Sequence, residues 1–325
     1  MNDPLSATVK RFLQKRLEPG RALLLGYSGG PDSKALLYVL KGCERFLDFS
    51  LHLAHIDHAW REESAHEALA LQEEAKGLDL PFHLKTLEAA DFTPGNLEEQ
   101  ARDHRQQFFR EVYEKYNCQA LLLGHHAGDQ AEVVLKRLFE GAHLTHLKGI
   151  EAERALGGIT IWRPWLNVHK PQIIKWLDAH KLPYITDSTN ANPAFLRGRM
   201  RTEIFPEIQR QFGKDSTENL VRLAESASEL TDYLQKRIAP LLAKVEQTAE
   251  AQQLQLRQEL PELHPFEIKF LVREWLALRG SMASREVIDQ AAEALFSAVE
   301  PLKFPVNQGW LHVQKGELQL HINSN

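Results

Sequence analysis

Short apolar runs alternate with segments of helical periodicity along the first two thirds of the chain. The apolar runs are residues 22–27, 51–56, 81–84 and 120–124. Each run has the length of a strand buried inside a parallel sheet. The segments between them are rich in helix formers, as in 32–40 and 97–116. Regular alternation of strand and helix predicts an α/β fold, with a doubly wound parallel sheet that carries helices on both faces.

The pattern changes near Asp215. From Leu220 to Leu241, apolar residues recur every three or four positions, which is the spacing of one helical face. Two more helical patterns follow within 265–299, and an alternating stretch around Lys315-Gly316 is typical of a hairpin. The expected domains are a catalytic domain over residues 1–215 and a smaller, mostly helical domain over residues 216–325, which would bind the substrate.

Composition and cysteine use narrow the class of protein. The 325 residues are 43% hydrophobic and 26% charged, which suits a globular chain with a substantial core. The two cysteines, Cys43 and Cys118, form no C-x-x-C pair, which argues against a thiolate metal site or a disulfide framework. The charged first helix is unlike a secretory signal, and no segment approaches the roughly 20 apolar residues of a membrane span. We expect a cytoplasmic protein without a membrane partner.

The strongest chemical signal is the segment SGGPDS at residues 28–33, between a predicted buried strand and a predicted helix. The glycines allow a tight turn, and the N–H groups at the start of the helix can bind an anion such as phosphate. Two serine hydroxyls can donate to phosphate oxygens. The carboxylate of Asp32 would repel phosphate, so its presence points to a magnesium ion that bridges the two. A glycine-rich turn with a capping side chain is the alternative interpretation.

A second signal is LGHHAGDQAE, where another strand runs into a helix. His125 and Asp129 are four residues apart, so on a helix they would share a face and converge on one ligand or metal. The alternative is that the two histidines only cap the helix. At the end of the second strand, His55, Asp57, His58 and Arg61 either lie near a bound adenine or solvate a loop. Ligands of doubly wound sheets bind at this carboxyl edge.

A third signal is an arginine-rich segment that follows Asp187-Ser188-Thr189-Asn190. Residues 195–214 contain five basic residues, including Arg197 and Arg201, and two acidic ones. This segment is therefore locally basic, although the whole chain carries a net charge of −5. Arginine forks bind phosphate oxygens, so this segment is a candidate contact for nucleic acid or nucleotide. A solvated charge run is the alternative. Arg102 and Arg105 are weaker candidates for the same pocket.

Four segments, in the order SGGPDS, LGHHAGDQAE, RPWLNVHKPQI and DSTNANPAFLRGRMR, resemble the tRNA(Ile)-lysidine synthase family of PP-loop ATP pyrophosphatases. The resemblance covers roughly the first two thirds of the chain and is looser after Asp215. Four positions depart from the usual pattern: Gly128 replaces an acidic residue, Glu140 replaces an arginine, His143 replaces a common glycine, and Gly198 replaces an asparagine.

The resemblance implies a ligase that forms a carbon–nitrogen bond. The carbonyl oxygen at carbon 2 of a wobble cytidine, in an isoleucine tRNA with a CAU anticodon, would attack the α-phosphate of ATP and release pyrophosphate. Free lysine would then displace AMP from that carbon. A homodimer is compatible with this resemblance. Alternatives are another PP-loop tRNA-modifying enzyme such as a thiolase, an amide-forming synthetase of the GMP or NAD type, or a non-catalytic tRNA-binding relative.

The resemblance also implies roles for individual residues. ATP would be bound by Ser28, Gly29, Gly30, Pro31, Asp32 and Ser33. Mg²⁺ would be bound by Asp32 and Asp129, and the catalytic residues would be Asp32, His125, Asp129, Arg197 and Arg201. Of these, His125 and Asp129 would serve adenylation, while Arg197 and Arg201 would contact phosphate or tRNA.

Overall fold

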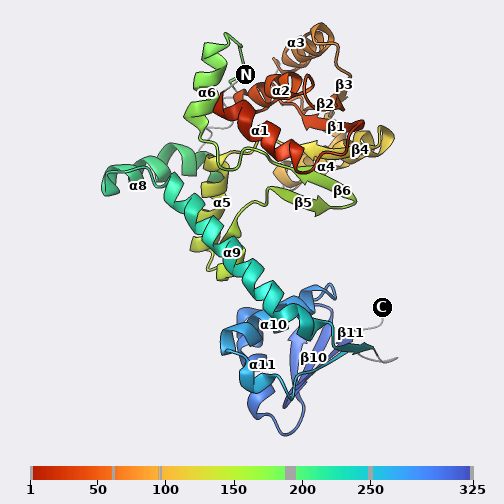
Figure 1. The fold of residues 1–325 in the computed structure, drawn as a ribbon, viewed down its shortest axis with the longest axis vertical. Helices are drawn as coiled ribbons and strands as arrows, with labels where there is room; N and C mark the ends of the chain where they lie inside the picture. Colours follow the sequence, from red (N-terminus) through yellow and green to blue (C-terminus); the bar gives the residue numbers. More distant parts are fainter. Residues whose placement is uncertain are drawn as a thin grey trace. The chain divides into compact units, whose positions relative to one another are not determined.

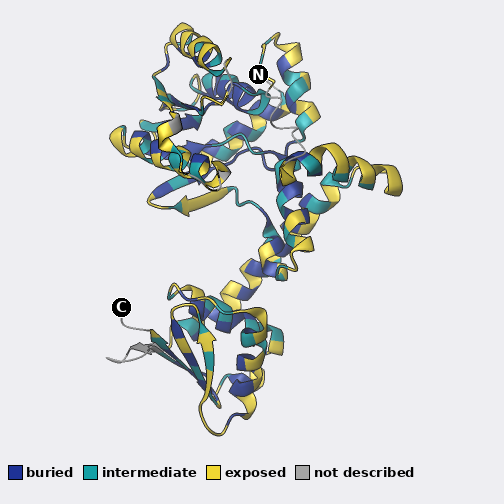
Figure 2. Cartoon of the chain, turned by 180° about the vertical axis from the view of Figure 1, so that it is seen from behind, coloured by how far each residue is buried: buried dark blue, intermediate teal, exposed yellow. Residues whose placement is uncertain are grey.

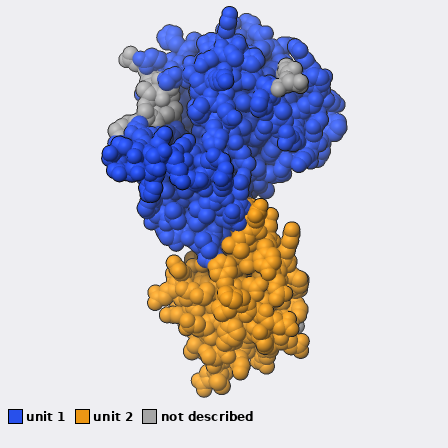
Figure 3. Space-filling view, turned by 60° about the vertical axis from the view of Figure 1, so that its left-hand side comes forward, with its two compact units in different colours: residues 1–227 blue, residues 228–325 orange. Residues whose placement is uncertain are grey.

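The computed structural model describes residues 3–60, 63–93, 95, 97–186, 195–247 and 252–322. The chain divides into two compact units, residues 1–227 and 228–325 (Figure 3). The sequence pattern places a boundary near Asp215, just before helix α9 (Thr217–Leu242), whereas the two compact units divide inside this helix. Within the described part of the chain, no helix combines the length and the apolar character that crossing a membrane requires.

A six-stranded sheet forms the centre of the first unit (Figure 1). Across the sheet, the strands are β3 (Phe82–Thr86), β2 (Phe49–Asp57), β1 (Arg21–Gly26), β4 (Cys118–Leu122), β6 (Ile159–Trp162) and β5 (Glu153–Leu156). All neighbours pair in parallel except β5, which is antiparallel to β6. The four predicted strands correspond to β1 to β4. The β5–β6 hairpin, which turns at Gly157-Gly158, was not predicted, because β5 is largely exposed and lacks an apolar run.

Helices cover both faces of this sheet, which confirms the predicted doubly wound fold. The helices of this unit are α1 (Pro4–Gln14), α2 (Pro31–Cys43), α3 (Ser64–Gly77), α4 (Leu97–Lys115), α5 (Ala127–Phe139) and α6 (Lys170–Ala179), followed by α7 (Leu196–Arg199) and α8 (Phe205–Phe212), of which α8 buries no residue. Short turns of helix lie at Ala89–Asp91, Leu144–Lys148 and Met200–Ile204. Residues of α1, α2, α3 and α6 pack into one core, and those of α4 pack into a second core with other strand residues. Their outer faces are exposed, as the yellow surfaces in Figure 2 show.

The strand order places the ends of β1 and β4 side by side. From β1 the chain moves to β2 and β3 on one side, and it then returns to β4 on the other side of β1. Leu25 pairs with Leu122, so the loops that follow these two strands leave the same edge of the sheet. A Cβ added to Gly124 would lie only 3.1 Å from the backbone carbon of Asp32. Such a switch point is where doubly wound sheets bind their ligands.

The second unit combines helices with an antiparallel sheet. Beyond α9, its helices are α10 (Pro265–Ala277) and α11 (Arg285–Ser297), with a short turn of helix at Leu260–Glu262. Its strands, in order across the sheet, are β7 (Val245–Gln247), β8 (Gln252–Gln255), β11 (Glu317–Ile322), β10 (Gly309–Gln314) and β9 (Leu302–Val306). The predicted hairpin at Lys315-Gly316 is confirmed as β10–β11. The other three strands were missed because two are short and polar, and the third carries Pro305, which only an edge strand tolerates.

Candidate active site

The SGGPDS segment forms the turn between β1 and α2, as predicted. Gly29 has a φ of +74°, a conformation that favours glycine, and an added Cβ there would lie 2.7 Å from Ile185 and 2.8 Å from Leu71. Gly30 is the N-cap of α2, and Pro31 begins the helix, where its missing N–H costs nothing. The turn thus brings bare backbone to the N-terminus of a helix, which is the arrangement that binds phosphate.

The two serines of this loop have different environments. Ser33 is buried, and its Oγ accepts from the Ser28 N–H at 3.2 Å and donates to the Gly30 carbonyl oxygen at 3.1 Å. The Ser28 hydroxyl is 3.1 Å from the same Oγ, but Ser28 itself is exposed. Ser33 therefore fixes the shape of the loop, whereas Ser28 is the serine that a ligand can reach.

Asp32 forms an ion pair with Lys170, a lysine from a helix that is distant in the sequence. Lys170 Nζ, at the start of α6, donates to Asp32 Oδ2 at 2.5 Å. The other oxygen, Asp32 Oδ1, is buried and has no hydrogen-bond partner. His126 Nε2 lies 3.8 Å from this oxygen. A buried carboxylate oxygen without a partner is costly unless a ligand satisfies it, so this atom is a candidate ligand for a cation.

The side chain of His126 lies between the carboxylates of Asp129 and Asp32. The His126 N–H donates to Asp129 Oδ2 at 2.9 Å, and His126 Nδ1 accepts from the Gly128 N–H at 3.0 Å, which caps helix α5. The His126 ring therefore stands between the two carboxylates, 3.8 Å from one and 3.7 Å from the other. Burial raises the pKa of Asp129, but His126, His125, the His126 N–H and Arg201 outweigh it and leave this pKa below its usual value.

His125 does not share a helical face with Asp129, because α5 begins only at Ala127 with His126 as its N-cap. The spacing argument for His125 is thus wrong in its geometry. Arg163 Nε instead donates to His125 Nδ1 at 3.1 Å. Burial lowers the pKa of His125 to about 4, and Arg163 contributes to this shift while Asp129 opposes it. His125 is therefore neutral near pH 7 and carries its proton on Nε2, where it can donate a hydrogen bond.

The predicted arginines meet carboxylates of α5. Arg201 Nε donates to Glu132 Oε1 at 2.5 Å, and Arg201 Nη2 donates to Asp129 Oδ1 at 2.9 Å. Arg197 Nε lies 4.0 Å from Glu132 Oε2, and its side chain is 65% exposed. Arg201 is thus held by the chain's own acids, whereas Arg197 remains accessible to a ligand.

Arg105, on α4, belongs to a group of arginines near this cluster. Burial lowers the pKa of Arg105, and the charges of Arg102 and Arg197 lower it further. Mutual repulsion of this kind is relieved when an anion binds between the guanidinium groups. The segment Asp187-Ser188-Thr189-Asn190, which was also singled out, lies outside the described residues.

The polar residues at the end of β2 take part in local hydrogen bonds. His55 Nδ1 is 2.8 Å from the Tyr27 carbonyl oxygen, and Asp57 Oδ1 accepts from the Ala59 N–H at 2.8 Å. The Asp57 contact stabilises the turn after β2, whereas the His55 contact joins β2 to the residue that follows β1. These contacts are compatible with both predicted roles of the residues, which are to bind a base or to stabilise the loop. Arg61, which was singled out with them, lies outside the described residues.

The chain's carboxylates fit a magnesium ion that a nucleotide brings with it. Among the described residues, no group of three or more His, Cys, Asp or Glu side chains is arranged to hold a metal by itself. Magnesium usually binds proteins through one or two carboxylates and takes its remaining ligands from water and substrate phosphates. Asp32 and Asp129 match that requirement, and the unpartnered Asp32 Oδ1 is the specific atom that suits it.

Besides His126 and Glu132 of the LGHHAGDQAE segment, two further residues of the site were not predicted as functional. Lys170 lies within RPWLNVHKPQI, and Arg163 begins the same segment. Each acts on a residue that was predicted: Lys170 binds Asp32, and Arg163 fixes the tautomer of His125. The only available signal was their place in that segment, because the partners of Lys170 and Arg163 are 138 and 38 residues away in the sequence.

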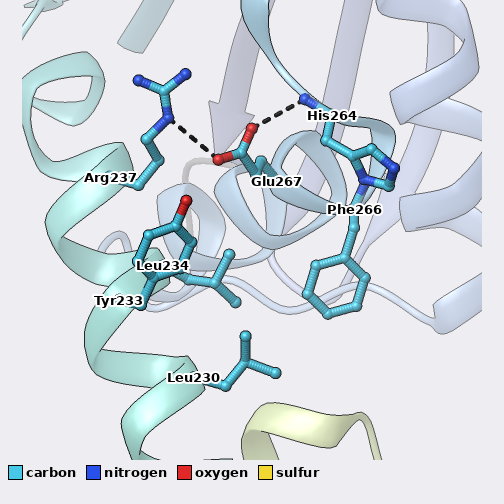
Figure 4. Close-up of a pocket in the computed structure, with 7 residues that line it drawn as sticks. All are labelled: Leu230, Tyr233, Leu234, Arg237, His264, Phe266 and Glu267. Atoms are coloured by element: carbon cyan, nitrogen blue, oxygen red, sulfur yellow. Dashed lines mark hydrogen bonds and ion pairs between the residues drawn. The ribbon is translucent and has the colours of Figure 1, made fainter.

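The second unit carries a separate surface groove of about 570 Å³ (Figure 4). It is lined by Leu230, Tyr233, Leu234, Arg237, His264, Phe266 and Glu267. Arg237 Nε pairs with Glu267 at 3.1 Å, and the other oxygen of this carboxylate accepts from the His264 N–H at 2.9 Å. None of the predicted site residues lines this groove.

Comparisons with known proteins agree with the motifs. Residues 1–208 match the PP-loop domain family. A tRNA(Ile)-lysidine synthase from Protochlamydia amoebophila is 36% identical, over 95% of this chain and 67% of that protein. Those from Chlamydia trachomatis serovar L2 and Chlamydia muridarum are 36% and 39% identical and cover 86% and 83% of both chains, respectively.

A solved structure shares the fold. The U34-tRNA thiolase NcsA from Methanococcus maripaludis superposes with a TM-score of 0.56 at 15% identity, over 69% of this chain and 78% of that chain. This likeness concerns the fold alone. The family match and the identities, however, confirm the resemblance drawn from the four motifs. The chain belongs to the tRNA(Ile)-lysidine synthase family of PP-loop ATP-binding enzymes.

Proposed function

We propose that this chain ligates lysine to carbon 2 of the wobble cytidine of a CAU-anticodon isoleucine tRNA and releases AMP and pyrophosphate. Family membership supports a carbon–nitrogen ligase that uses ATP and modifies tRNA. The observation that carries the proposal is the pairing of two carboxylates at the phosphate-binding turn. Asp32 and Asp129 both lie within 4 Å of the His126 ring, at the edge where β1 and β4 end.

The residues of the turn would bind the triphosphate. The backbone of Gly29 and Gly30, the N-terminus of α2 and the exposed Ser28 hydroxyl would contact the nucleotide at this edge. Asp32 and Asp129 would hold Mg²⁺, which supplies charge neutralisation to the phosphates when bound. Lys170 would then exchange its contact with Asp32 for a phosphate oxygen, because the cation takes over the neutralisation of that carboxylate.

His125 and the arginines would stabilise the charge that develops during adenylation. Neutral His125 can donate from Nε2 to an oxygen of the α-phosphate or of the base, but near pH 7 it has no proton to give as an acid. Arg197 is exposed and would meet phosphate or tRNA, together with Arg102 and Arg105. Arg201 would hold Asp129 and Glu132 in place until the nucleotide binds.

No protein nucleophile is needed for this chemistry. The carbonyl oxygen of the base attacks the α-phosphate, pyrophosphate leaves, and the base then carries AMP as a good leaving group. Lysine's side-chain amine attacks carbon 2 and expels AMP. The protein mainly positions the reactants and neutralises phosphate charge.

Thiolase chemistry is less compatible with the cysteines. Cys43 and Cys118 are both buried, and burial raises the pKa of each thiol to about 11. A thiol that stays protonated is a poor nucleophile and a poor ligand for a cluster. The two cysteines also lie on different elements, α2 and β4.

The test is AMP formation by the purified chain with ATP, Mg²⁺, lysine and tRNA transcripts. AMP release that requires both lysine and the CAU-anticodon isoleucine tRNA, with lysine found in the RNA, is the expected result. A methionine tRNA with the same anticodon is the matched control. RNA binding without ATP turnover would favour the non-catalytic relative and refute the proposal. Oligomeric state, for which we propose a homodimer, is read from light scattering of the same sample.

A further inference from the structure

The two residues that flank the SGGPDS loop bind the same carboxylate. Tyr27 directly precedes Ser28, and its hydroxyl donates to Glu74 Oε2 at 2.5 Å. Lys34 directly follows Ser33, and its Nζ lies 2.5 Å from Glu74 Oε1 and 2.6 Å from Glu74 Oε2. Glu74 is on α3, about forty residues away in the sequence. One side chain of a neighbouring helix therefore joins both ends of the loop.

This carboxylate is largely removed from water. The side chains of Lys34 and Glu74 are only 8% and 16% exposed, and Tyr27 is 1% exposed. A third donor, the Tyr38 hydroxyl, binds Glu74 Oε1 at 2.9 Å. Burial, followed by the contact with Glu74, raises the pKa of both phenols, that of Tyr38 to about 12, so both remain hydrogen-bond donors. A buried carboxylate with three donors is held in one geometry.

Helix α3 also contacts the loop through its apolar face. Leu71 lies three residues before Glu74, so the two side chains project from the same face of α3. A Cβ on Gly29 would approach Leu71 to 2.8 Å, which means that the loop backbone lies directly against this leucine. Leu71 thus packs against Gly29, and Glu74 binds the residues at both ends of the loop. The shape of the loop thus depends on where α3 lies.

The first hydrogen bond of α2 belongs to the same arrangement. The Lys34 N–H donates to the Gly30 carbonyl oxygen at 2.9 Å, so the residue bound to Glu74 also closes the first turn of the helix that would face the phosphates. Displacing Lys34 would disturb Gly30, whose N–H donates to the Ser28 hydroxyl at 3.4 Å and belongs to the turn that we propose to bind the triphosphate.

We infer that Glu74 is a positioning residue for the nucleotide site: it fixes both ends of the SGGPDS loop, so that the loop's N–H groups are already arranged for the triphosphate before ATP arrives. This inference rests on the proposed role of the loop in binding ATP. It predicts a specific loss of nucleotide affinity when Glu74 or its contact with a flanking residue is removed. Part of the binding free energy would then be used to order the loop.

The sharpest test compares Tyr27→Phe with Tyr38→Phe. Each variant removes one phenol hydroxyl from Glu74 without leaving an unpaired charge, but only Tyr27 adjoins the loop. Affinity for a non-hydrolysable ATP analogue with Mg²⁺ is measured by calorimetry. We expect the Kd of Tyr27→Phe to rise about fivefold or more, the usual range for a lost hydrogen bond to a charged group, and that of Tyr38→Phe to stay within about twofold of wild type. Equal effects of the two variants, or none, would overturn the inference.

Glu74→Gln and Glu73→Gln extend the comparison. Glu73 neighbours Glu74, but its side chain is 73% exposed and its ion pair with Lys76 is long, at 3.9 Å. Replacing Glu73 should therefore leave the affinity for ATP unchanged. Glu74→Gln should raise the Kd and KM for ATP about tenfold, while the KM for lysine and for tRNA and the value of kcat remain near wild type. A lower Tm with unchanged ATP affinity would show that Glu74 only stabilises the fold. If Glu74→Gln fails to fold, the tyrosine pair still decides.

Failure of the proposed function can be told apart from failure of this inference. If wild type binds the ATP analogue but attaches no lysine to tRNA, the proposed ligation is wrong, and the tyrosine comparison still measures the role of Glu74. If wild type binds no ATP analogue, the inference falls with the loop's proposed role. Recovery of affinity in Glu74→Gln by a second change, Lys34→Met, would also count against it, because that double variant keeps no link between Lys34 and α3.

Discussion

Lys170 Nζ and Asp32 Oδ2 form a 2.5 Å ion pair between the start of α6 and the start of α2. The lysine neutralises the carboxylate that we expect to hold Mg²⁺ together with the nucleotide. Both side chains remain partly exposed, at 37% and 27%, so ions can reach the pair. Lys170 neutralises the charge of Asp32 and would offer a positive charge to a phosphate that binds here.

Replacing Lys170 with methionine should weaken ATP binding about tenfold, because the phosphate contact that we propose for Lys170 would be lost. Calorimetry with a non-hydrolysable ATP analogue and Mg²⁺ measures the effect. Lys175→Met is the matched control, since Lys175 is an exposed lysine of the same helix. Equal ATP affinity of Lys170→Met and wild type would mean that the ion pair only fixes α6 against α2.

Asp32→Ala should abolish pyrophosphate release, with a loss of at least about a hundredfold, because the carboxylate proposed to hold Mg²⁺ is gone. The fold should survive, since Asp32 is partly exposed and contributes nothing to the sheet. Pyrophosphate release and circular dichroism are measured side by side, and Asp178→Asn, at an exposed position of α6, is the control. Retained turnover would remove Asp32 from the mechanism.

Gly128→Ala should displace His126 from its place between the two carboxylates. An added Cβ would lie 2.7 Å from His126 Cε1, so the ring that caps α5 must move. Loss of such a cap costs about 0.5–2 kcal/mol of unfolding free energy. We expect a lower Tm and a reduced kcat. Gly141→Ala, with nothing within 4 Å of its added Cβ but a left-handed φ of +70°, controls for glycine loss at the other end of α5. If Gly128→Ala retained full activity, the position of His126 would not matter for catalysis.

His125 should make the free energy of unfolding fall as the pH drops from about 6.5 to about 4. Its pKa is about 4 in the folded chain against an ordinary 6.5, so over this range the unfolded chain binds a proton that the folded chain does not. Denaturant titrations at several pH values measure this slope, and His125→Gln should flatten it. Nitrogen-15 NMR should also find a neutral ring protonated on Nε2 at pH 6. A charged His125 ring at that pH would contradict the arrangement with Arg163.

Much of the first unit follows from its sequence. The apolar runs predicted β1 to β4, since strands buried on both faces need little else, and parallel alternation places the ends of β1 and β4 at one edge. The SGGPDS turn and Asp129 therefore lie together, as expected. The family comparison independently confirms the class of enzyme that the four motifs indicated.

What the sequence could not provide was the pairing of charges across the site. The contact between Lys170 and Asp32 depends on how α6 packs against α2, which no local pattern encodes. The choice of His126 rather than His125 depends on the exact residue at which α5 begins, and helix boundaries are the least certain part of such a reading. The additional strands of the second unit are short, polar or carry a proline, so their alternation was too weak to detect.

The buried hydroxyl of Ser33 has a consequence for chemical labelling. Its oxygen is engaged by the Ser28 N–H, by the Ser28 hydroxyl and by the Gly30 carbonyl oxygen, so no lone pair is directed toward an incoming electrophile. Reagents that acylate or phosphonylate activated serines should therefore not modify Ser33. Inhibitors directed at this loop would instead have to imitate the phosphates of the nucleotide that we propose it binds.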